Sequence, residues 1–121
     1  MNIEVFRQYC LNLPGVEETL PFGPDTLVYK VMGKAFALTG LDDESFLVNL
    51  KCEPERAIEL RENYPGLIIP GWHMNKKHWN TVSFDAGLSD KLLIELIHHS
   101  YDLVVDGLPV KVKAELKRWH E

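Results

Sequence analysis

The sequence is short of the residues that mark several special classes of protein. It has only two cysteines in 121 residues, Cys10 and Cys52, and neither belongs to a CxxC pair. A disulfide framework or a zinc site of cysteine ligands has no support, and both side chains are expected to be buried free thiols. No apolar run approaches the roughly 20 residues that cross a bilayer. The N-terminal pattern is that of an amphipathic helix rather than a secretion signal, so we expect a cytoplasmic protein without membrane contact.

Short catalytic motifs are missing as well. The chain contains no P-loop GxxxxGK string, no GxGxxG, no HExxH and no GxSxG. This absence disfavours nucleotide-hydrolysing, zinc-protease and serine-hydrolase chemistry, and we expect a protein that is not an enzyme and needs no cofactor. His73 and His78 have no nearby carboxylate or cysteine to complete a ligand set, so no metal site is predicted. A small-molecule or metal-linked activity at these two histidines is the least favoured alternative.

Positive charge is also scarce. The chain has 13 Lys and Arg residues against 18 Asp and Glu residues, a formal net charge of -5. Residues 1–69 hold 6 basic and 11 acidic residues, whereas residues 70–121 hold 7 of each. Broad, nonspecific coating of nucleic acid is therefore disfavoured, and any basic surface must be local.

The composition that remains is that of one ordinary globular domain. Apolar residues make up 45% of the chain and charged residues 26%. A length of 121 residues suits a single hydrophobic core and is too short for two. We therefore expect residues 1–121 to fold as a single domain.

Hydrophobic periodicity predicts helices and strands in mixed order. Apolar residues at helical spacing, with Asn2, Pro54, Ser89 and Pro109 as start signals, predict helices over residues 2–13, 54–64, 89–105 and from 109 onward. β-rich runs predict strands over residues 26–31, 35–40 and 45–51, with extended pieces at 67–70 and 80–84. The predicted fold class is α+β, an antiparallel sheet of about five strands backed by helices.

The two C-terminal helices differ in character. In the helix over residues 89–105, Ser100 lies near the centre of the apolar face, where a small residue permits close approach to the sheet, and His98 and His99 are expected on the solvated side. The last helix has an apolar stripe of Val112, Leu116 and Trp119. Its basic residues lie off that stripe and make it the most positive stretch of the chain: Lys111, Lys113, Lys117 and Arg118.

Residues 70–82, PGWHMNKKHWNTV, are the strongest candidate for a functional surface. These thirteen residues hold two of the three tryptophans, two of the five histidines, two adjacent lysines and two asparagines. Trp and His side chains can stack on flat ligands, lysines attract phosphate or carboxylate, and asparagine can donate and accept hydrogen bonds. The mixture is typical of a binding site.

Within this segment the expected roles differ. Pro70, Gly71 and Trp72 are interpreted as mainly architectural, which leaves His73 and residues 75–80 for binding. The alternative is that Trp72 and Trp79 pack on the core, His73 and Asn80 hydrogen-bond an irregular connection, and the lysines only favour solubility.

The order of these motifs resembles the MmcQ/YjbR-like family along essentially the whole chain. The most specific matching strings are YPG at 64–66, PGWHMNKKHWN at 70–80 and SYDLV at 100–104. The resemblance implies a compact, two-layer α+β fold similar to the CyaY-like and secretion-chaperone-like topologies. Members of this bacterial family are commonly described as DNA-binding proteins with a double-wing arrangement.

The resemblance also implies a set of site residues. The family's central motif falls on His73, Asn75, Lys76, Lys77, His78, Trp79 and Asn80. Lys30 and Lys51 match lysines at strand positions.

DNA binding is the leading hypothesis for function. Lys76 and Lys77, joined by the basic residues of the last helix, would contact phosphates, while Trp79 or His78 lies against bases or sugars. The acidic turn at residues 42–44 departs from this picture, because one wing would then repel a phosphate backbone.

A protein-interaction or chaperone-like adaptor is the alternative, and we expect a monomer in either case. The adaptor gains support if Lys76 and Lys77 lie far from the basic C-terminal helix while Trp72 and Trp79 form an exposed apolar patch.

Overall fold

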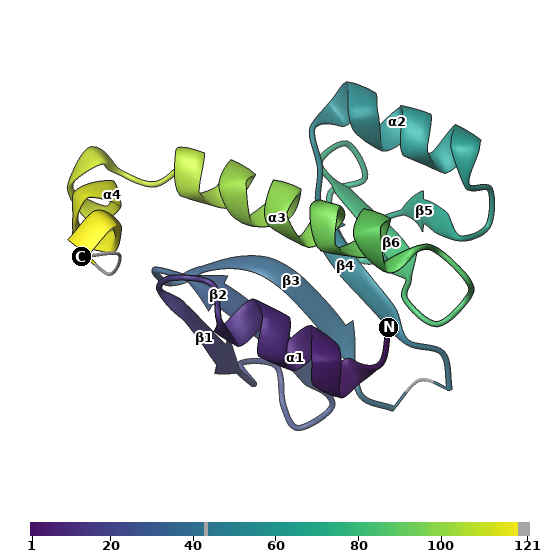
Figure 1. Ribbon diagram of the computed structural model, residues 1–121, viewed down its shortest axis with the longest axis horizontal. Coiled ribbons are helices and arrows are strands. Elements are labelled where there is room, and N and C mark those ends of the chain that lie inside the picture. Colours follow the sequence, from purple (N-terminus) through teal and green to yellow (C-terminus); the bar gives the residue numbers. More distant parts are fainter. Residues whose placement is uncertain (43, 119–121) are drawn as a thin grey trace.

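A single antiparallel sheet organises the molecule. The computed structural model describes residues 1–42 and 44–118 (Figure 1). Its six strands lie in the order β1-β2-β3-β4-β6-β5. The strands are β1 (Val16–Thr19), β2 (Thr26–Val31), β3 (Lys34–Gly40), β4 (Leu47–Lys51), β5 (Ile68–Pro70) and β6 (Trp79–Ser83). The helices are α1 (Ile3–Leu11), α2 (Pro54–Asn63), α3 (Asp90–Asp106) and α4 (Val110–Lys117).

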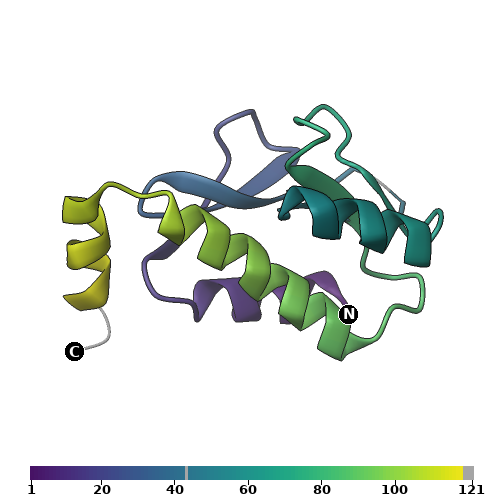
Figure 2. The same ribbon diagram turned by 90° about the horizontal axis from the view of Figure 1, so that it is seen from above.

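In the described part of the chain, helices cover one face of this sheet and leave the other open. Viewed from above, α1 and α3 lie together below the strands, and the connections β1–β2 and β5–β6 rise on the other side (Figure 2). The predicted α+β class with two layers is confirmed, with six strands rather than about five. The strand that the sequence did not reveal is β1, because VEET is short and carries two glutamates, which strands disfavour.

Local signals set the helix starts as predicted. The Asn2 side chain accepts a hydrogen bond from the Val5 backbone N–H at 2.9 Å, and the Ser89 hydroxyl accepts one from Leu92 N–H at 3.2 Å. Pro54 occupies the first turn of α2, preceded by Glu53 as the capping residue. These caps satisfy backbone donors that have no partner inside a helix.

Aromatic side chains fill the space between the helices and the sheet. Phe6 of α1 is fully buried and makes edge-to-face contacts with three rings, Tyr29, Phe46 and Phe84, at centroid distances of 5.3 to 5.5 Å. Phe36 of β3, also fully buried, packs edge-to-face on Tyr101 of α3. Interlocked rings of this kind fix the position of both helices over the sheet.

Ser100 joins α3 to the sheet at an irregular point. The pairing of β2 with β3 shifts register between Tyr29 and Lys30, so Phe36 is an extra residue in β3. The Ser100 hydroxyl accepts from Lys51 N–H at 2.8 Å and donates to the Phe36 carbonyl. Its predicted position on the apolar face is confirmed, and the structure adds a second role: Ser100 satisfies two backbone groups beside the bulge.

His98 and His99 are half-buried and hydrogen-bonded, which corrects the expectation that both lie on a solvated face. The Tyr9 hydroxyl and His98 Nε2 form a 2.6 Å hydrogen bond between α1 and α3. His99 Nε2 accepts from Glu53 N–H at 3.1 Å and ties α3 to the start of α2. Burial lowers the pKa of His99, which favours the neutral ring that this acceptor role requires. The two side chains diverge, as side chains at successive helical positions must. His98 is hydrogen-bonded to α1 and His99 to the residue that caps α2.

An ion pair supports the edge of the sheet under α1. Arg7 donates to both carboxylate oxygens of Glu18, at 2.7 and 3.0 Å, and the buried Tyr29 hydroxyl donates to the same carboxylate at 2.6 Å. The Arg7 hydrogen bonds hold the pKa of Glu18 below its ordinary value, against the opposing effect of burial. Burial, followed by the Glu18 contact, raises the pKa of Tyr29.

Cys10 and Cys52 are buried free thiols, as predicted, and burial raises the pKa of both. Within residues 1–42 and 44–118, no helix is long and apolar enough to cross a membrane, and no three His, Cys, Asp or Glu residues are placed to hold a metal. Asp43 of the acidic turn and Trp119 of the last apolar stripe lie outside the described residues.

Candidate functional site

The face of the sheet opposite the helices carries one continuous row of side chains. Strand register places the same row across all six strands, from β1 to β5. Directly paired residues point to the same side of a sheet, so these six side chains share one face. That face is the one turned away from α1 and α3. Its members are Thr19, Val28, Leu38, Asn49, Thr81 and Ile69.

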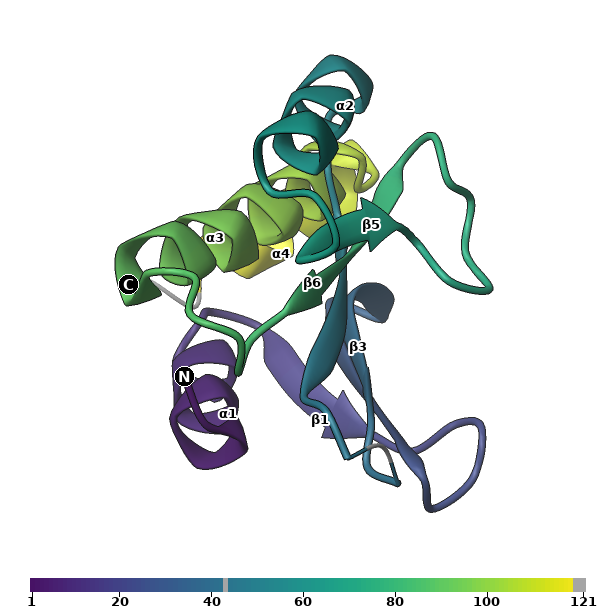
Figure 3. The same ribbon diagram turned by 90° about the vertical axis from the view of Figure 1, so that its right-hand side faces the viewer.

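Two loops turn this face into a groove. Residues 20–25, between β1 and β2, and residues 71–78, between β5 and β6, project from opposite ends of the strands on the open side (Figure 3). The open-face groove between them has a volume of about 630 Å³, within the range of small-molecule sites. Its floor includes Val28, Lys30, Leu38 and Asn49, and its walls include Phe22, Trp72, His73 and Met74.

Exposed aromatic side chains stand in both walls. Phe22 is 75% exposed and Trp72 is 59% exposed, which is unusual for rings of this size. The Trp72 and His73 rings are stacked, with centroids 5.5 Å apart and planes 23° from parallel. Trp72 was expected to be architectural, whereas the structure places it on the surface of the groove.

The base of the second loop is tightly built. Gly71 donates its N–H to the Trp79 carbonyl at 2.9 Å, and a Cβ at Gly71 would lie 2.8 Å from Trp79 Cβ. Trp72 N–H donates to the Thr81 hydroxyl at 3.0 Å, and that hydroxyl donates to Asn49 Oδ1. The architectural role predicted for Gly71 therefore fits the structure, and the exposed rings stand on a fixed support.

Asn75, Lys76 and Lys77 form the turn that leads back into β6. Asn75 Oδ1 accepts from Lys77 N–H at 3.0 Å, and the Asn75 carbonyl accepts from His78 and Trp79 N–H groups. Arg61 of α2 donates to the Lys76 carbonyl at 3.0 Å and holds the turn against the helix. Asn75 thus shapes the backbone, and the lysine side chains remain exposed.

The other residues predicted within this motif face different ways. Asn80 is 2% exposed and donates to the Ala57 carbonyl beneath α2, so it lies on the helix-covered side and away from the groove. Trp79 and His78 are half-buried; the His78 carbonyl accepts from Cys52 N–H at 2.8 Å. The structure therefore places His73 in the wall of the groove and leaves the lysines exposed in the same loop, while Asn80 is separated from them.

Lysines gather at one end of the sheet. Strands β2 and β4 run in the same direction, so Lys30 and Lys51, near their C-terminal ends, lie at the same end of the sheet. Lys51 is paired with Trp79 at the start of β6, which brings Lys76 and Lys77 to this end too. Lys34 and Lys51 also border a hollow of about 200 Å³ beside the last turn of α3.

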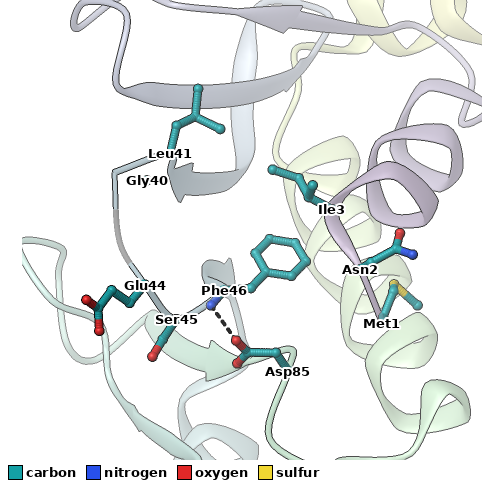
Figure 4. Close-up of a pocket in the computed structure, with 9 residues that line it drawn as sticks. All are labelled: Met1, Asn2, Ile3, Gly40, Leu41, Glu44, Ser45, Phe46 and Asp85. Atoms are coloured by element: carbon teal, nitrogen blue, oxygen red, sulfur yellow. Dashed lines mark hydrogen bonds between the residues drawn. The ribbon is translucent and has the colours of Figure 1, made fainter.

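The other end of the strands is acidic. A hollow of about 480 Å³ lies there between the start of α1 and residues 40–41 and 44–46, with Glu44 and Asp85 at its border (Figure 4). Asp85 accepts from Phe46 N–H at 2.9 Å, and Asp25 lies at the same end, where its carbonyl accepts from Leu41 N–H. None of the predicted site residues lines this hollow.

The basic residues of α4 are remote from the groove. Helix α4 lies beyond the C-terminal end of α3, at the side of the molecule away from α2 and β5 (Figures 1 and 2). Lys111 is exposed there, and Lys113 and Lys117 border a separate hollow with Tyr101 and Leu116. Lys111 therefore does not join His73, Lys76 and Lys77 in one surface.

The sequence did not single out Phe22 and Asn49, which line the groove, or Thr81, which supports its wall. Phe22 lies in the string LPFGPD, where an aromatic ring between proline and glycine was a sign of surface exposure. Asn49 and Thr81 are polar residues in apolar strands, and they lie directly opposite each other on β4 and β6. Only the pairing of β4 with β6 reveals that they meet.

Fold and site together define a class of α+β protein in which one sheet face is covered by helices and the other is an aromatic-walled groove. The chain belongs to the YjbR family, whose model matches residues 11–103. It is 43% identical over 115 residues to the YbdF protein of Escherichia coli O157:H7, covering 95% of this chain and 91% of the relative. It is 34% identical over 109 residues to the YjbR protein of Escherichia coli K12, covering 90% and 92%.

Solved structures show the same fold. The crystal structure of the Deinococcus radiodurans protein DR2400, with a DUF419 domain, superposes with a TM-score of 0.90 at 40% identity, covering 96% of this chain and 88% of that one. A Pseudomonas syringae protein gives a TM-score of 0.72 at 29% identity, covering 85% and 98%.

Proposed function

We propose that this protein binds DNA across the open face of its sheet and carries out no chemical step of its own. The observation that carries the proposal is the gathering of Lys30, Lys51, Lys76 and Lys77 at one end of that sheet, in a chain of net charge -5. A local basic border of this kind is what phosphate contacts require when the overall charge is unfavourable.

In this proposal the two wings of the family description are the loops beside the groove, residues 20–25 and 71–78, in place of the acidic turn at residues 42–44. They flank one open face, and the aromatic rings in their walls suit sugars or bases while the lysines suit phosphates. In this proposal Trp72 and His73, rather than Trp79 and His78, form the stacking surface, and α4 lies outside the interface.

Titration of a labelled oligonucleotide at two ionic strengths tests the proposal. Binding should weaken steeply with salt, and the double variant Lys76→Ala, Lys77→Ala should reduce the salt slope by roughly 0.7 for each lysine that contacts a phosphate of a single strand. The matched control is Lys111→Ala with Lys113→Ala on α4, which should bind as the wild type does. Typical nonspecific binding of DNA sets the threshold. A dissociation constant weaker than about 100 μM at low salt would contradict the proposal.

An adaptor function is the second candidate, and a specific observation favours it. Lys76 and Lys77 are separated from the basic α4. Trp79 is half-buried and does not form the expected patch with Trp72, but Phe22 and Trp72 are both exposed beside the groove. In that case the groove would hold an apolar segment of another protein. Binding of an uncharged, aromatic-rich peptide that does not weaken with salt would favour this candidate over DNA.

A further inference from the structure

The open-face groove offers hydrogen-bond donors on an apolar, aromatic background. Its walls are aromatic, and Val28 and Leu38 make its floor apolar. Among the described residues that line the groove, Lys30 has a charged side chain and none has a carboxylate. Glu17, the cross-strand partner of Lys30 on the edge strand β1, is the acidic neighbour on the same face. A ligand that fits must therefore combine a flat apolar part with acceptor or anionic groups.

A chain of hydrogen bonds fixes what Asn49 presents. The Thr81 hydroxyl accepts from the Trp72 backbone N–H, so its own hydrogen is free to donate to Asn49 Oδ1. With its oxygen engaged in this way, the Asn49 side chain offers its amide nitrogen, a donor, to the groove that it lines. Carbonyl oxygens and ring nitrogens of nucleobases are acceptors of this kind.

His73 adopts a backbone conformation that is unfavourable for a non-glycine residue. Its φ of 62° lies in the left-handed region, and it is one of two non-glycine residues with positive φ among the described residues. This conformation is found where the His73 ring stacks on Trp72. Strain in a ligand-facing wall is a recurring feature of binding sites, because it holds side chains in a geometry that the ligand needs. The stacked pair provides a fixed flat platform.

We propose, on the basis of the proposed function, that the open-face groove holds an unpaired base of a single-stranded nucleic acid. The base lies on the Trp72–His73 platform, with Phe22 in the facing wall and the Asn49 amide donating to the base edge. Lys30 contacts an adjacent phosphate, and the strand continues toward Lys76 and Lys77. Bases in a duplex are stacked on one another and cannot offer a face to these rings, so the groove selects single strands.

Three DNA probes of equal length separate this inference from DNA binding in general. They are a thymidine homopolymer, an abasic strand with the same phosphates, and a duplex, each titrated at one fixed ionic strength with the whole protein. We expect the thymidine strand to bind at least about tenfold more tightly than the abasic strand, the usual effect of one stacked base. We also expect it to bind more tightly than the duplex.

Variants then locate the effect. Trp72→Ala should remove most of the preference for the thymidine strand, Trp72→Phe should retain part of it, and Phe22→Ala should lower it by a smaller factor. The control is Val110→Ala, an exposed apolar residue on the remote α4, which should leave all three affinities unchanged. Because Trp72 is largely exposed, its variant is expected to fold, and a circular dichroism spectrum checks this.

Each result has one meaning. Equal affinity for the thymidine and abasic strands would overturn the base-binding inference while leaving DNA binding through the lysines intact. Equal or tighter binding of the duplex would overturn the single-strand selectivity. No binding of any probe would overturn the inference together with the proposed function.

Discussion

The two faces of the sheet differ although they are built from alternate residues of the same strands. On the helix-covered face Val82, Asn80 and Leu50 are buried beside Leu60 of α2 and Leu96 of α3. On the open face, Thr81 and Asn49 lie one residue away along these strands and support the rings of a groove. The covered-face positions pack against helices, whereas the proposed binding surface combines open-face positions with residues of two loops. The comparison predicts that substitutions on the two faces have separable effects.

The largest effect should follow from a substitution in the covered face. Phe36→Ala removes a fully buried ring and its contact with Tyr101, and it should lower the free energy of unfolding by about 3 to 5 kcal/mol. Urea unfolding followed by circular dichroism measures the change. A loss below about 1 kcal/mol would break the comparison, because the covered face would then not be the main source of stability.

A smaller but still clear effect should follow at Ser100. Ser100→Ala leaves Lys51 N–H and the Phe36 carbonyl without the hydroxyl that satisfies both, and it should cost about 1 to 3 kcal/mol. Ser100→Val is a useful companion, since it also fills the close helix–sheet contact and should cost more. Stability equal to the wild type for Ser100→Ala would show that the bulge satisfies its own backbone groups.

The ion pair under α1 gives a prediction that depends on pH. The pKa of Glu18 is lowered in the folded protein, so its contribution is complete well above the ordinary value of 4.5 and is lost as pH falls through the folded pKa. Glu18→Gln should therefore reduce stability at pH 7, and the difference from the wild type should shrink below about pH 4.5. Urea unfolding at a series of pH values measures this; a difference independent of pH would contradict the assignment to charge.

The smallest effects on stability should come from the exposed side chains of the loop beside the open-face groove. Trp72→Ala should cost less than about 1 kcal/mol, and Lys76→Ala with Lys77→Ala less than about 0.5 kcal/mol, since exposed side chains bury little on folding. Trp79→Ala, half-buried and in contact with Gly71, should cost more than either and serves as the matched aromatic control. If Trp72→Ala proves the most destabilising of these variants, the separation of the two faces is wrong.

Much of the fold could be predicted because it is specified locally. Capping side chains, prolines and apolar spacing determine where α1, α2 and α3 begin and which faces they bury. Strand β1 was missed because its pairing with β2, rather than its own sequence, makes it a strand. The partners of His98 and His99 come from α1 and from residue 53, so no helix pattern could have revealed them.

The candidate site was predicted only in part, for a related reason. The segment 70–82 was found by its composition, but composition does not tell which side of the sheet a residue faces. Alternation in NTVSF, with Asn80, Val82 and Phe84 on one side, was a usable signal that Asn80 is buried. The groove itself combines residues from β2, β3, β4 and two loops, and only the strand order brings them together.

The placement of both groove walls in connections between paired strands has a consequence for how such a protein can diversify. A turn that joins neighbouring antiparallel strands can change in length and composition while the strands stay in register. Exchanging residues 20–25 or 72–78 between homologues, with Gly71 kept, should therefore transfer ligand preference without altering the rest of the molecule. In such a protein the sheet and helices would stay the same, and the two loops would determine which ligand binds.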